Sequence, residues 1–588
     1  MLTCRTRMGL HSSSIITTVR RRGASRKTGG MFHGNLFRRP DRPPADYFAF
    51  HILTNYVIEL YFLLIVVDLR LSGGRTAENG RRLASGCCVG TGLHGRFLEY
   101  GVKIGILTFG DGRRRVTVAS TPDCMRFQKQ LQEFLAAQGH EVVAGNAVAW
   151  NHESVAKQCA RLNRAGVQAV VFNFVIWSYP DLTAQAAIRF DRAVSIMMYG
   201  VLNPSFPGWV AYFASAGSMT EIGRPFARAL GDLADPAVKS AMTHWLNDAN
   251  PQGRAAGIAA AKKLHGQRYG RFDGPSMGMY TGHVDESRWM SQFGVHVVHR
   301  GQLWFWEMAQ KIESKRVRAG LDWLESVCKE IKYDGKKLTP GLEGTLARQV
   351  RMYLAVKDYC REDGIDFCGL TGQMDMTEQP HMCIMDVQEA LLNDNTDWEQ
   401  PKKKPLICAT ECDSNGALTM QLMHLISGTP VLFADMRHYF ADHDVYDLVN
   451  SGQHAPWFSR RHKNYRKNWA EVTLYPAMDF YFHAGGASVQ FYSQPAELIT
   501  LGRITRKRGE FQMHLVRASV PDLGFDTMES LARQTTYTWP HMFVRFKCPP
   551  EAIGANYSSN HIHGIFGDHV AALTAAGEQL GMEVTVLA

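Results

Sequence analysis

The sequence lacks the cysteine patterns of a disulfide scaffold or a structural zinc site. Its 588 residues include 12 cysteines, yet these form no Cys-x-x-Cys pair and no compact framework. Small secreted domains and structural zinc sites both depend on such spacings. Several cysteines also fall within predicted helices and strands, so we expect reduced thiols and a cytoplasmic protein.

Most of the chain also lacks an excess of basic charge. The formal net charge is +10, but residues 1–100 hold 15 Lys/Arg against 6 Asp/Glu, whereas residues 101–588 hold 50 against 49. Nucleic-acid-binding domains normally present a basic surface. The nearly neutral body therefore argues against nucleic acid as a partner.

Residues 1–100 differ in composition from the rest of the chain. Residues 1–45 are rich in Arg, Ser and Thr and poor in acids, which is typical of a transit peptide. Residues 47–69 are apolar enough to suggest a membrane anchor, but the run contains Glu59, which is costly in mid-bilayer. We interpret residues 1–100 as an N-terminal extension outside the catalytic fold. A targeting segment or a true anchor is the alternative.

Residues 101–265 and 266–434 each alternate apolar strands with helix-like runs, which predicts two consecutive α/β domains with parallel sheets. In the first, we expect strands at 102–108, 141–144 and 168–174 and a helix from about 122 to 138. In the second, we expect long helices at about 302–331 and 341–362 and a buried strand at 366–370.

Residues 435–588 consist of short alternating runs divided by Gly, Pro and basic turns. This pattern predicts an antiparallel, β-rich C-terminal domain. The expected strands lie at 480–482, 488–492, 498–505 and 511–516.

The stretch from Lys404 to Phe440 carries the strongest functional signal. Two apolar runs in it end at carboxylates, Glu411 and Asp435, and a helix-like run lies between them. We interpret this as strand, helix and parallel strand, in which both strand ends emerge at one edge of the sheet. The two carboxylates could then bind a divalent cation or share acid–base work. Acids at strand ends are also common without a function.

Other polar residues follow predicted strands at the same kind of edge. Arg113 follows the first strand, where it could hold a hydroxylated or anionic ligand or simply form a solvated turn. Ser276 lies in a Gly-rich loop, and Gln373 follows the strand at 366–370. The Gly-x-Gly near Arg113 lacks the third glycine of a dinucleotide-binding loop.

Histidines in the Gly/Ser/Asn loops 451–454 and 559–564 could supply neutral imidazoles. Imidazole with carboxylate is a normal ligand set for Mn²⁺, Co²⁺ or Zn²⁺. Cys412 beside Glu411 could be a soft ligand, although a packing role is the simpler interpretation.

Several motifs together resemble the L-fucose isomerase family, which is related to the L-arabinose isomerases. They occur in the family's order from residue 101 onward: FGDGRRR (109–115), PSMGMY (275–280), ATECDSNGALTMQ (409–421), VLFADMRHY (431–439), SGQ (451–453), FYFHAGGAS (480–488), TWP (538–540) and SSNHIHG (558–564). A set of motifs in register is far more specific than any one of them.

The resemblance implies a three-domain ketol isomerase, usually a homohexamer, that uses Mn²⁺ or another divalent ion such as Co²⁺. It implies that Glu411, Asp435 and His561 bind the metal. The substrate-contacting positions that it implies are Arg113, Gln373, Ser451, Tyr481, Trp539 and Asn560, with Trp177 reaching a site formed with a neighbouring subunit. The expected reaction interconverts L-fucose and L-fuculose, or D-arabinose and D-ribulose.

Chemically, a divalent ion chelating O1 and O2 would stabilise an enediolate, and Glu411 and Asp435 could carry the protons. One departure concerns His454, which lies near where arabinose isomerases carry an additional histidine ligand. A fourth ligand there would favour an L-arabinose isomerase-like activity. A non-catalytic sugar-binding protein on the same scaffold is the other alternative.

Overall fold

The computed structural model describes residues 102–202, 206–274 and 277–587. The predicted extension at 1–100 and Ser276 lie outside these residues. Within the described ranges, no helix is both long and apolar enough to cross a membrane.

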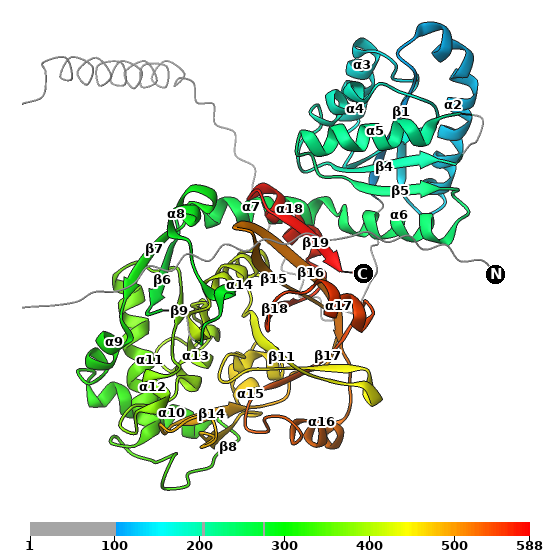
Figure 1. Ribbon diagram of the computed structural model, residues 1–588. Helices are drawn as coiled ribbons and strands as arrows, with labels where there is room; N and C mark the ends of the chain where they lie inside the picture. Colours follow the sequence, from blue (N-terminus) through cyan, green and yellow to red (C-terminus); the bar gives the residue numbers. More distant parts are fainter. Residues whose placement is uncertain (1–101, 203–205, 275–276, 588) are drawn as a thin grey trace, which may run out of the picture. The chain divides into compact units, whose positions relative to one another are not determined.

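The first α/β domain is built on one parallel sheet with strand order β2-β1-β3-β4-β5. Figure 1 labels β1, β4 and β5 of this sheet. Its strands are β1 (Lys103–Phe109), β2 (Glu141–Ala144), β3 (Ala169–Phe174), β4 (Ser195–Val201) and β5 (Ala227–Gly231). The three strands expected here are confirmed. Its helices are α2 (Arg114–Ala136), α3 (His152–Arg164), α4 (Pro180–Ala187), α5 (Gly208–Glu221) and α6 (Pro236–Asp248).

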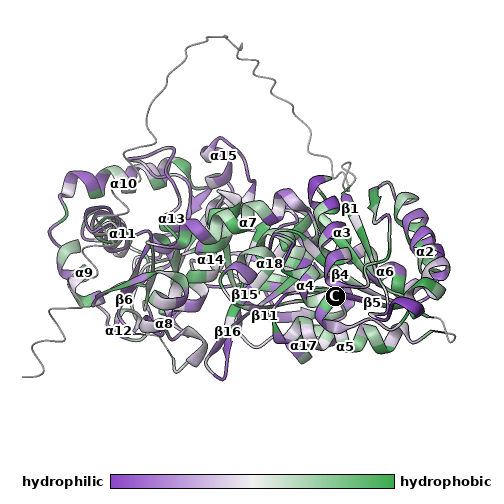
Figure 2. Cartoon of the chain, turned by 90° about the horizontal axis from the view of Figure 1, so that it is seen from above, coloured by the Kyte–Doolittle hydropathy of each residue, from purple (hydrophilic) through white to green (hydrophobic). Residues whose placement is uncertain are grey.

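Both faces of this sheet are covered. Residues of α2 and α6 pack with one set of strand side chains, and residues of α3, α4 and α5 pack with the other. Strands that are buried on two faces consist of nearly continuous apolar residues. Figure 2 accordingly shows β1 largely in the hydrophobic colour, whereas α2 is largely in the hydrophilic one. The predicted start of α2 was wrong, because Pro122 lies inside the helix rather than at its first turn.

The second α/β domain has a parallel sheet of order β10-β9-β6-β7. Its strands are β6 (Arg268–Phe272), β7 (His296–Arg300), β9 (Phe367–Leu370) and β10 (Cys408–Ala409). The predicted strand at 366–370 and the helix at 341–362 are confirmed by β9 and by α11 (Thr345–Glu362). The predicted helix at 302–331 is two helices, α9 (Gln302–Ala309) and α10 (Ser314–Val327).

Further helices complete this region. They are α7 (Pro251–Leu264), η1 (Tyr280–Gly282), α8 (Glu286–Arg288), η2 (Trp289–Phe293), α12 (Asp375–Glu378), α13 (Asp386–Asn393), η3 (Thr410–Cys412) and α14 (Ser414–Ser427).

The C-terminal region is strand-rich, as predicted. Six antiparallel strands pair in a closed ring, β15-β18-β11-β12-β17-β16, because β15 and β16 also pair with each other. They are β11 (Leu432–Phe440), β12 (Val445–Val449), β15 (Ala496–Lys507), β16 (Glu510–Val520), β17 (His541–Phe546) and β18 (His561–Phe566). Such closure leaves no free edge in the ring.

A seventh strand, β19 (Glu583–Leu587), runs parallel to β16 outside the ring, and β8 (Glu330–Ile331), β13 (Thr473–Pro476) and β14 (Ala487–Gln490) form a small separate sheet. The predicted strand at 480–482 is a turn instead. The remaining helices are η4 (Ala441–His443), η5 (Pro456–Ser459), α15 (Tyr465–Trp469), α16 (Phe525–Ala532), α17 (Pro550–Asn556) and α18 (Val570–Gln579).

The predicted strand–helix–parallel strand unit around α14 is wrong in one respect. β10 belongs to the parallel sheet, but β11 belongs to the ring and pairs antiparallel with β12 and β18. Helix α14 lies between the two, with contacts to β9 and β10 on one side and to β15 and β18 on the other. Residues 414–424 of this helix are all buried, polar side chains such as Asn415 and Gln421 included.

Candidate active site

Glu411 lies on a strained turn between β10 and α14. Its backbone is left-handed (φ 57°, ψ 17°), and the next residue, Cys412, has φ 50°. Two consecutive non-glycine residues in this region cost conformational energy, and such strain concentrates at functional sites. The turn aims the buried Glu411 carboxylate toward the ring of strands.

Asp435 and His561 reach the same place from the ring. The two residues are opposite each other in the antiparallel pair of β11 and β18. Directly opposite residues project their side chains on one face of a sheet. Oδ1 of Asp435 lies 3.4 Å from Nε2 of His561.

Three donor atoms therefore converge. Nε2 of His561 is 3.3 Å from Oε2 of Glu411 as well as 3.4 Å from Asp435. Nε2 of His561 and Oε2 of Glu411 are buried and have no hydrogen-bond partner among the described residues. Among the described residues, no group of three or more His, Cys, Asp or Glu side chains has the geometry to hold a metal ion as it stands. Two carboxylates and an imidazole nitrogen with open lone pairs are nevertheless a donor set that suits a divalent transition-metal ion.

Asp413 fixes the orientation of the His561 ring. Nδ1 of His561 donates to Oδ2 of Asp413 over 2.7 Å, so Nε2 faces the other two carboxylates. Both oxygens of Asp413 also accept hydrogen bonds from Arg503, at 2.6 and 2.8 Å. A carboxylate behind a histidine is the usual support of a metal-binding imidazole. Gly416 allows this arrangement, since a Cβ there would lie 2.6 Å from Oδ2 of Asp413.

The pKa values follow from these contacts. Burial alone would raise the pKa of Asp413, but the charge of Arg503 and the hydrogen bond from His561 hold it far below its ordinary value. Burial alone would lower the pKa of His561, but the hydrogen bond to Asp413 and the adjacent carboxylates of Glu411 and Asp435 raise it to about 9. The space between His561 and the two carboxylates therefore favours a positive charge, whether a proton or a cation.

Two asparagines hold the Asp435 carboxylate. Nδ2 of Asn450 donates to Oδ2 over 2.8 Å, and Nδ2 of Asn560 donates to Oδ1 over 3.1 Å. Asn560 is one of the predicted substrate-contacting residues. Asn450, which directly precedes the SGQ motif, was not predicted from the sequence. Met279, on the loop before η1, lies against Asn560.

An aromatic surface adjoins these polar groups. The rings of Tyr481 and Trp539 lie 5.5 Å apart, and Trp539 also packs against Phe482. The Tyr481 hydroxyl accepts a hydrogen bond of 2.9 Å from Arg437, two residues beyond Asp435. The two predicted substrate-contacting aromatics therefore lie together, and a chain of contacts joins them to the strand that carries Asp435.

Helix α13 supports the loops of the site, and it was not predicted from the sequence. Asp386 and Glu389 are three residues apart, hence on one face of the helix, and both are buried. Oδ1 of Asp386 accepts a hydrogen bond of 2.5 Å from the Ser451 hydroxyl. A Cβ at Gly452, whose φ is +70°, would collide with the backbone of Asp386. Burial raises the pKa of Asp386 to about 7. The only sign in the sequence that α13 supports the site is the Asp-x-x-Glu spacing of Asp386 and Glu389.

His454 and Cys412 differ in their surroundings. His454 is fully buried, and neither ring nitrogen has a hydrogen-bond partner in the described chain. Burial, with the nearby charge of His541, lowers the pKa of His454 to about 3, so the ring is neutral. The Cys412 thiol contacts the backbone oxygens of Asp273 and Gly369, and burial raises its pKa to about 12. A neutral thiol with these contacts fits the packing role.

The structure does not bring the remaining predicted residues into the cluster. Gln373 follows β9, next to the end of β10 that leads to Glu411. Arg113 and Trp177 belong to the first domain, and among the described residues neither contacts Glu411. Arg113 is paired with the buried Asp111, with Nη2 2.5 Å from Oδ2, and its side chain is 63% exposed.

Comparison with known proteins agrees with this architecture. Three family models match in order along the chain: "L-fucose isomerase, first N-terminal domain" over residues 101–251, "L-fucose isomerase, second N-terminal domain" over 357–428, and "L-fucose isomerase, C-terminal domain" over 448–588. The order of the three matches, with two α/β domains before a β-rich domain, is that of an isomerase of this class. The chain belongs to the L-fucose isomerase family.

Among curated relatives, an L-fucose isomerase of Haemophilus influenzae is 23% identical over 545 residues, which covers 80% of this chain and 90% of the relative. An L-fucose isomerase of Citrobacter koseri is 23% identical over 537 residues, covering 78% and 88%. One of Escherichia coli is 22% identical with the same coverage.

Proposed function

We propose that this isomerase interconverts an aldose and its ketose, L-fucose and L-fuculose or D-arabinose and D-ribulose, with the help of a divalent metal ion. The observation that carries the proposal is the convergence of Glu411, Asp435 and His561 on one point. The unpartnered Nε2 of His561 and Oε2 of Glu411 support an ion there. We infer Mn²⁺, with Co²⁺ as the alternative, because the resemblance implies Mn²⁺ and a donor set of oxygen and nitrogen without thiolate is compatible with it.

An ion held by these three side chains would polarise the sugar carbonyl and stabilise an enediolate. Each of the two carboxylates can accept and return a proton at the sugar carbons or oxygens. Because Asn450 and Asn560 donate to Asp435, its carboxylate keeps one orientation during the transfer. Glu411, on its strained turn, has an unpartnered oxygen available for a proton.

We infer that the sugar is held by predicted residues in and near the cluster. Trp539 and Tyr481 offer an apolar surface for the ring or a methyl group, and Asn560, Ser451 and Gln373 offer hydrogen-bonding groups for hydroxyls. We infer that Arg113 and Trp177 serve the site of a neighbouring subunit in a homohexamer. The free cysteines of the described chain, of which all but Cys328 are buried, fit a cytoplasmic enzyme.

One observation favours a second candidate, an L-arabinose isomerase-like activity. His454 is buried and neutral and has two unpartnered nitrogens, as a fourth metal ligand requires. The deciding experiment is a turnover assay with L-fucose, D-arabinose and L-arabinose, in Mn²⁺ and in chelator. Turnover of L-fucose or D-arabinose that the chelator abolishes is the expected result. Sugar binding without turnover would overturn the proposal in favour of a sugar-binding protein.

A further inference from the structure

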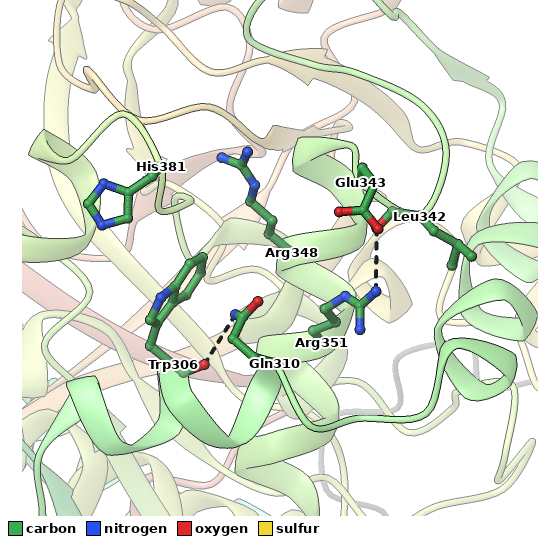
Figure 3. A pocket seen from close by; sticks show the side chains of 7 residues that line it. All are labelled: Trp306, Gln310, Leu342, Glu343, Arg348, Arg351 and His381. Atoms are coloured by element: carbon green, nitrogen blue, oxygen red, sulfur yellow. Dashed lines mark hydrogen bonds between the residues drawn. The ribbon is translucent and has the colours of Figure 1, made fainter.

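A cavity of about 390 Å³ lies between α9, α11 and the loop after α12. Figure 3 shows its lining side chains around one opening. They are Trp306, Gln310, Leu342, Glu343, Arg348, Arg351 and His381. None of them belongs to the site described above, and the volume is in the range of small-molecule sites.

The lining carries an excess of positive charge. Arg348 and Arg351 are three residues apart on α11, so their side chains share one face of the helix. The only carboxylate in the lining is Glu343, which is exposed. His381 adds an imidazole to the two guanidinium groups.

Neither guanidinium is neutralised by a carboxylate within the described residues. Arg348 donates to the backbone oxygens of Pro380 and Met382, at 3.4 and 3.2 Å. Arg351 donates to the backbone oxygens of Ile312 and Leu342, at 3.2 and 3.5 Å. These bonds anchor the two side chains at the cavity while leaving further N–H groups free. Anchored guanidinium groups with free donors match the oxygens of a phosphate group.

Beside the two guanidinium groups, Trp306 supplies an aromatic surface. Its ring lies 6.4 Å from the His381 ring in an edge-to-face arrangement, and it is partly exposed to the cavity. Aromatic faces bind the apolar faces of rings, while polar groups such as Gln310 satisfy hydroxyls. We propose that this cavity is a binding site for a sugar monophosphate, with the phosphate on Arg348 and Arg351 and the sugar on Trp306 and Gln310.

One segment of the chain connects the cavity to the candidate active site. Arg348 holds the backbone on both sides of His381, and His381 is eight residues beyond Gln373 on the same connecting segment. A ligand here would thus bind beside the segment that carries a predicted substrate-contacting residue. The proposal itself does not rest on the isomerase activity.

Isothermal titration calorimetry of the full chain tests the proposal, with glucose 6-phosphate, ribose 5-phosphate, inorganic phosphate and glucose as probes. We expect at least one of the two esters to bind about tenfold or more tightly than inorganic phosphate, a difference of about 1.4 kcal/mol. Glucose alone should give no measurable heat. Equal binding of inorganic phosphate and both esters, or no binding of either ester, would overturn the assignment.

Variants locate the binding. Arg348→Gln and Arg351→Gln should each weaken ester binding about tenfold or more, whereas Trp306→Ala should weaken the ester but not inorganic phosphate. Because Arg348 also holds a loop, Arg351→Lys provides a second test: it keeps the charge but loses the planar fork. Arg361→Gln on the same helix is the matched control outside the cavity.

Asp435→Asn separates this site from the candidate active site. Ester affinity unchanged in Asp435→Asn and reduced in the cavity variants supports the proposal, even if the protein turns over no sugar. Ester affinity lost in Asp435→Asn and unchanged in the cavity variants would place the phosphate at the Glu411 cluster and refute it.

Discussion

Nδ1 of His561 donates a hydrogen bond of 2.7 Å to Oδ2 of Asp413. This contact decides what the other ring nitrogen can do, since Nε2 is then left facing Glu411 and Asp435. Asp413 is itself held by Arg503 and caps α14 by accepting from the Gly416 amide. One carboxylate thus joins the buried helix, the ring of strands and the candidate metal site.

Replacing Asp413 tests this arrangement. In Asp413→Asn the buried Arg503 loses its counter-charge, and breaking a buried pair typically costs ~3–5 kcal/mol. The His561 ring also loses the acceptor that orients it, for which ~10–100-fold losses in metal affinity are typical. We expect a lower unfolding midpoint together with weaker Mn²⁺ binding by calorimetry. A normal midpoint and a normal metal titration would show that Asp413 is not the support of His561.

The two carboxylates of the cluster give the most direct prediction. Glu411→Gln and Asp435→Asn should each abolish turnover, because each removes a ligand charge and a proton carrier. Circular dichroism should remain that of wild type. Activity within about tenfold of wild type, a barrier change of only ~1.4 kcal/mol, would exclude the residue concerned from the chemistry.

That Glu411 and Asp435 meet could be predicted from the sequence, but the way they meet could not. Each follows an apolar run, which identifies a buried strand without saying which sheet it joins. One of the two partners of β11 is β18, whose His561 lies 126 residues beyond Asp435 along the chain. A run such as Leu432–Ala434 has the same pattern inside a parallel sheet and inside a closed ring of antiparallel strands.

Buried polar partners could not be predicted from the sequence either. Arg503 is fully buried although arginine is rarely so, and its partner Asp413 is 90 residues away. The break between α9 and α10 likewise has no Gly or Pro to signal it. The motifs predicted Asn560, Tyr481 and Trp539 as substrate-contacting residues, which stays a prediction; Asn560 donates to Asp435, and the rings of Tyr481 and Trp539 lie 5.5 Å apart.

Asp386 should make stability depend on pH. Its pKa is raised by burial from an ordinary value of 3.8 to about 7. Between these values the folded state binds more protons than the unfolded state, so the unfolding free energy falls as pH rises from about 4 to about 7. At ~1.4 kcal/mol per pKa unit, the ceiling of this effect is on the order of 4 kcal/mol.

Asp386→Asn removes the titration while keeping a hydrogen-bonding group beside Ser451. As pH rises from 5 to 7.5, the urea midpoint of the wild type should therefore fall relative to the midpoint of the variant. Asp386→Ala is the control that removes the contact as well and should raise the KM for the sugar. A midpoint difference that is constant with pH would show that Asp386 is ionised throughout.

The last prediction concerns His454, whose imidazole is fully buried with both nitrogens unpartnered. An unsatisfied buried polar group costs about 1–3 kcal/mol unless a partner is supplied. If that partner is the metal ion, His454→Ala should weaken Mn²⁺ affinity by about 10–100-fold or more, and raising Mn²⁺ should restore part of the activity. If the nitrogens instead face the sugar, the same substitution should raise KM and leave the metal titration unchanged.

His561→Ala is the matched control, because its Nε2 faces both carboxylates whichever role His454 has. Loss of metal affinity in both variants would give four protein ligands and favour the arabinose-isomerase-like candidate. Loss in His561→Ala beside a normal titration in His454→Ala would leave Glu411, Asp435 and His561 as the protein ligands. The fully buried His454 would then be a residue of the pocket wall, and its neutral ring would act on the sugar rather than on the ion.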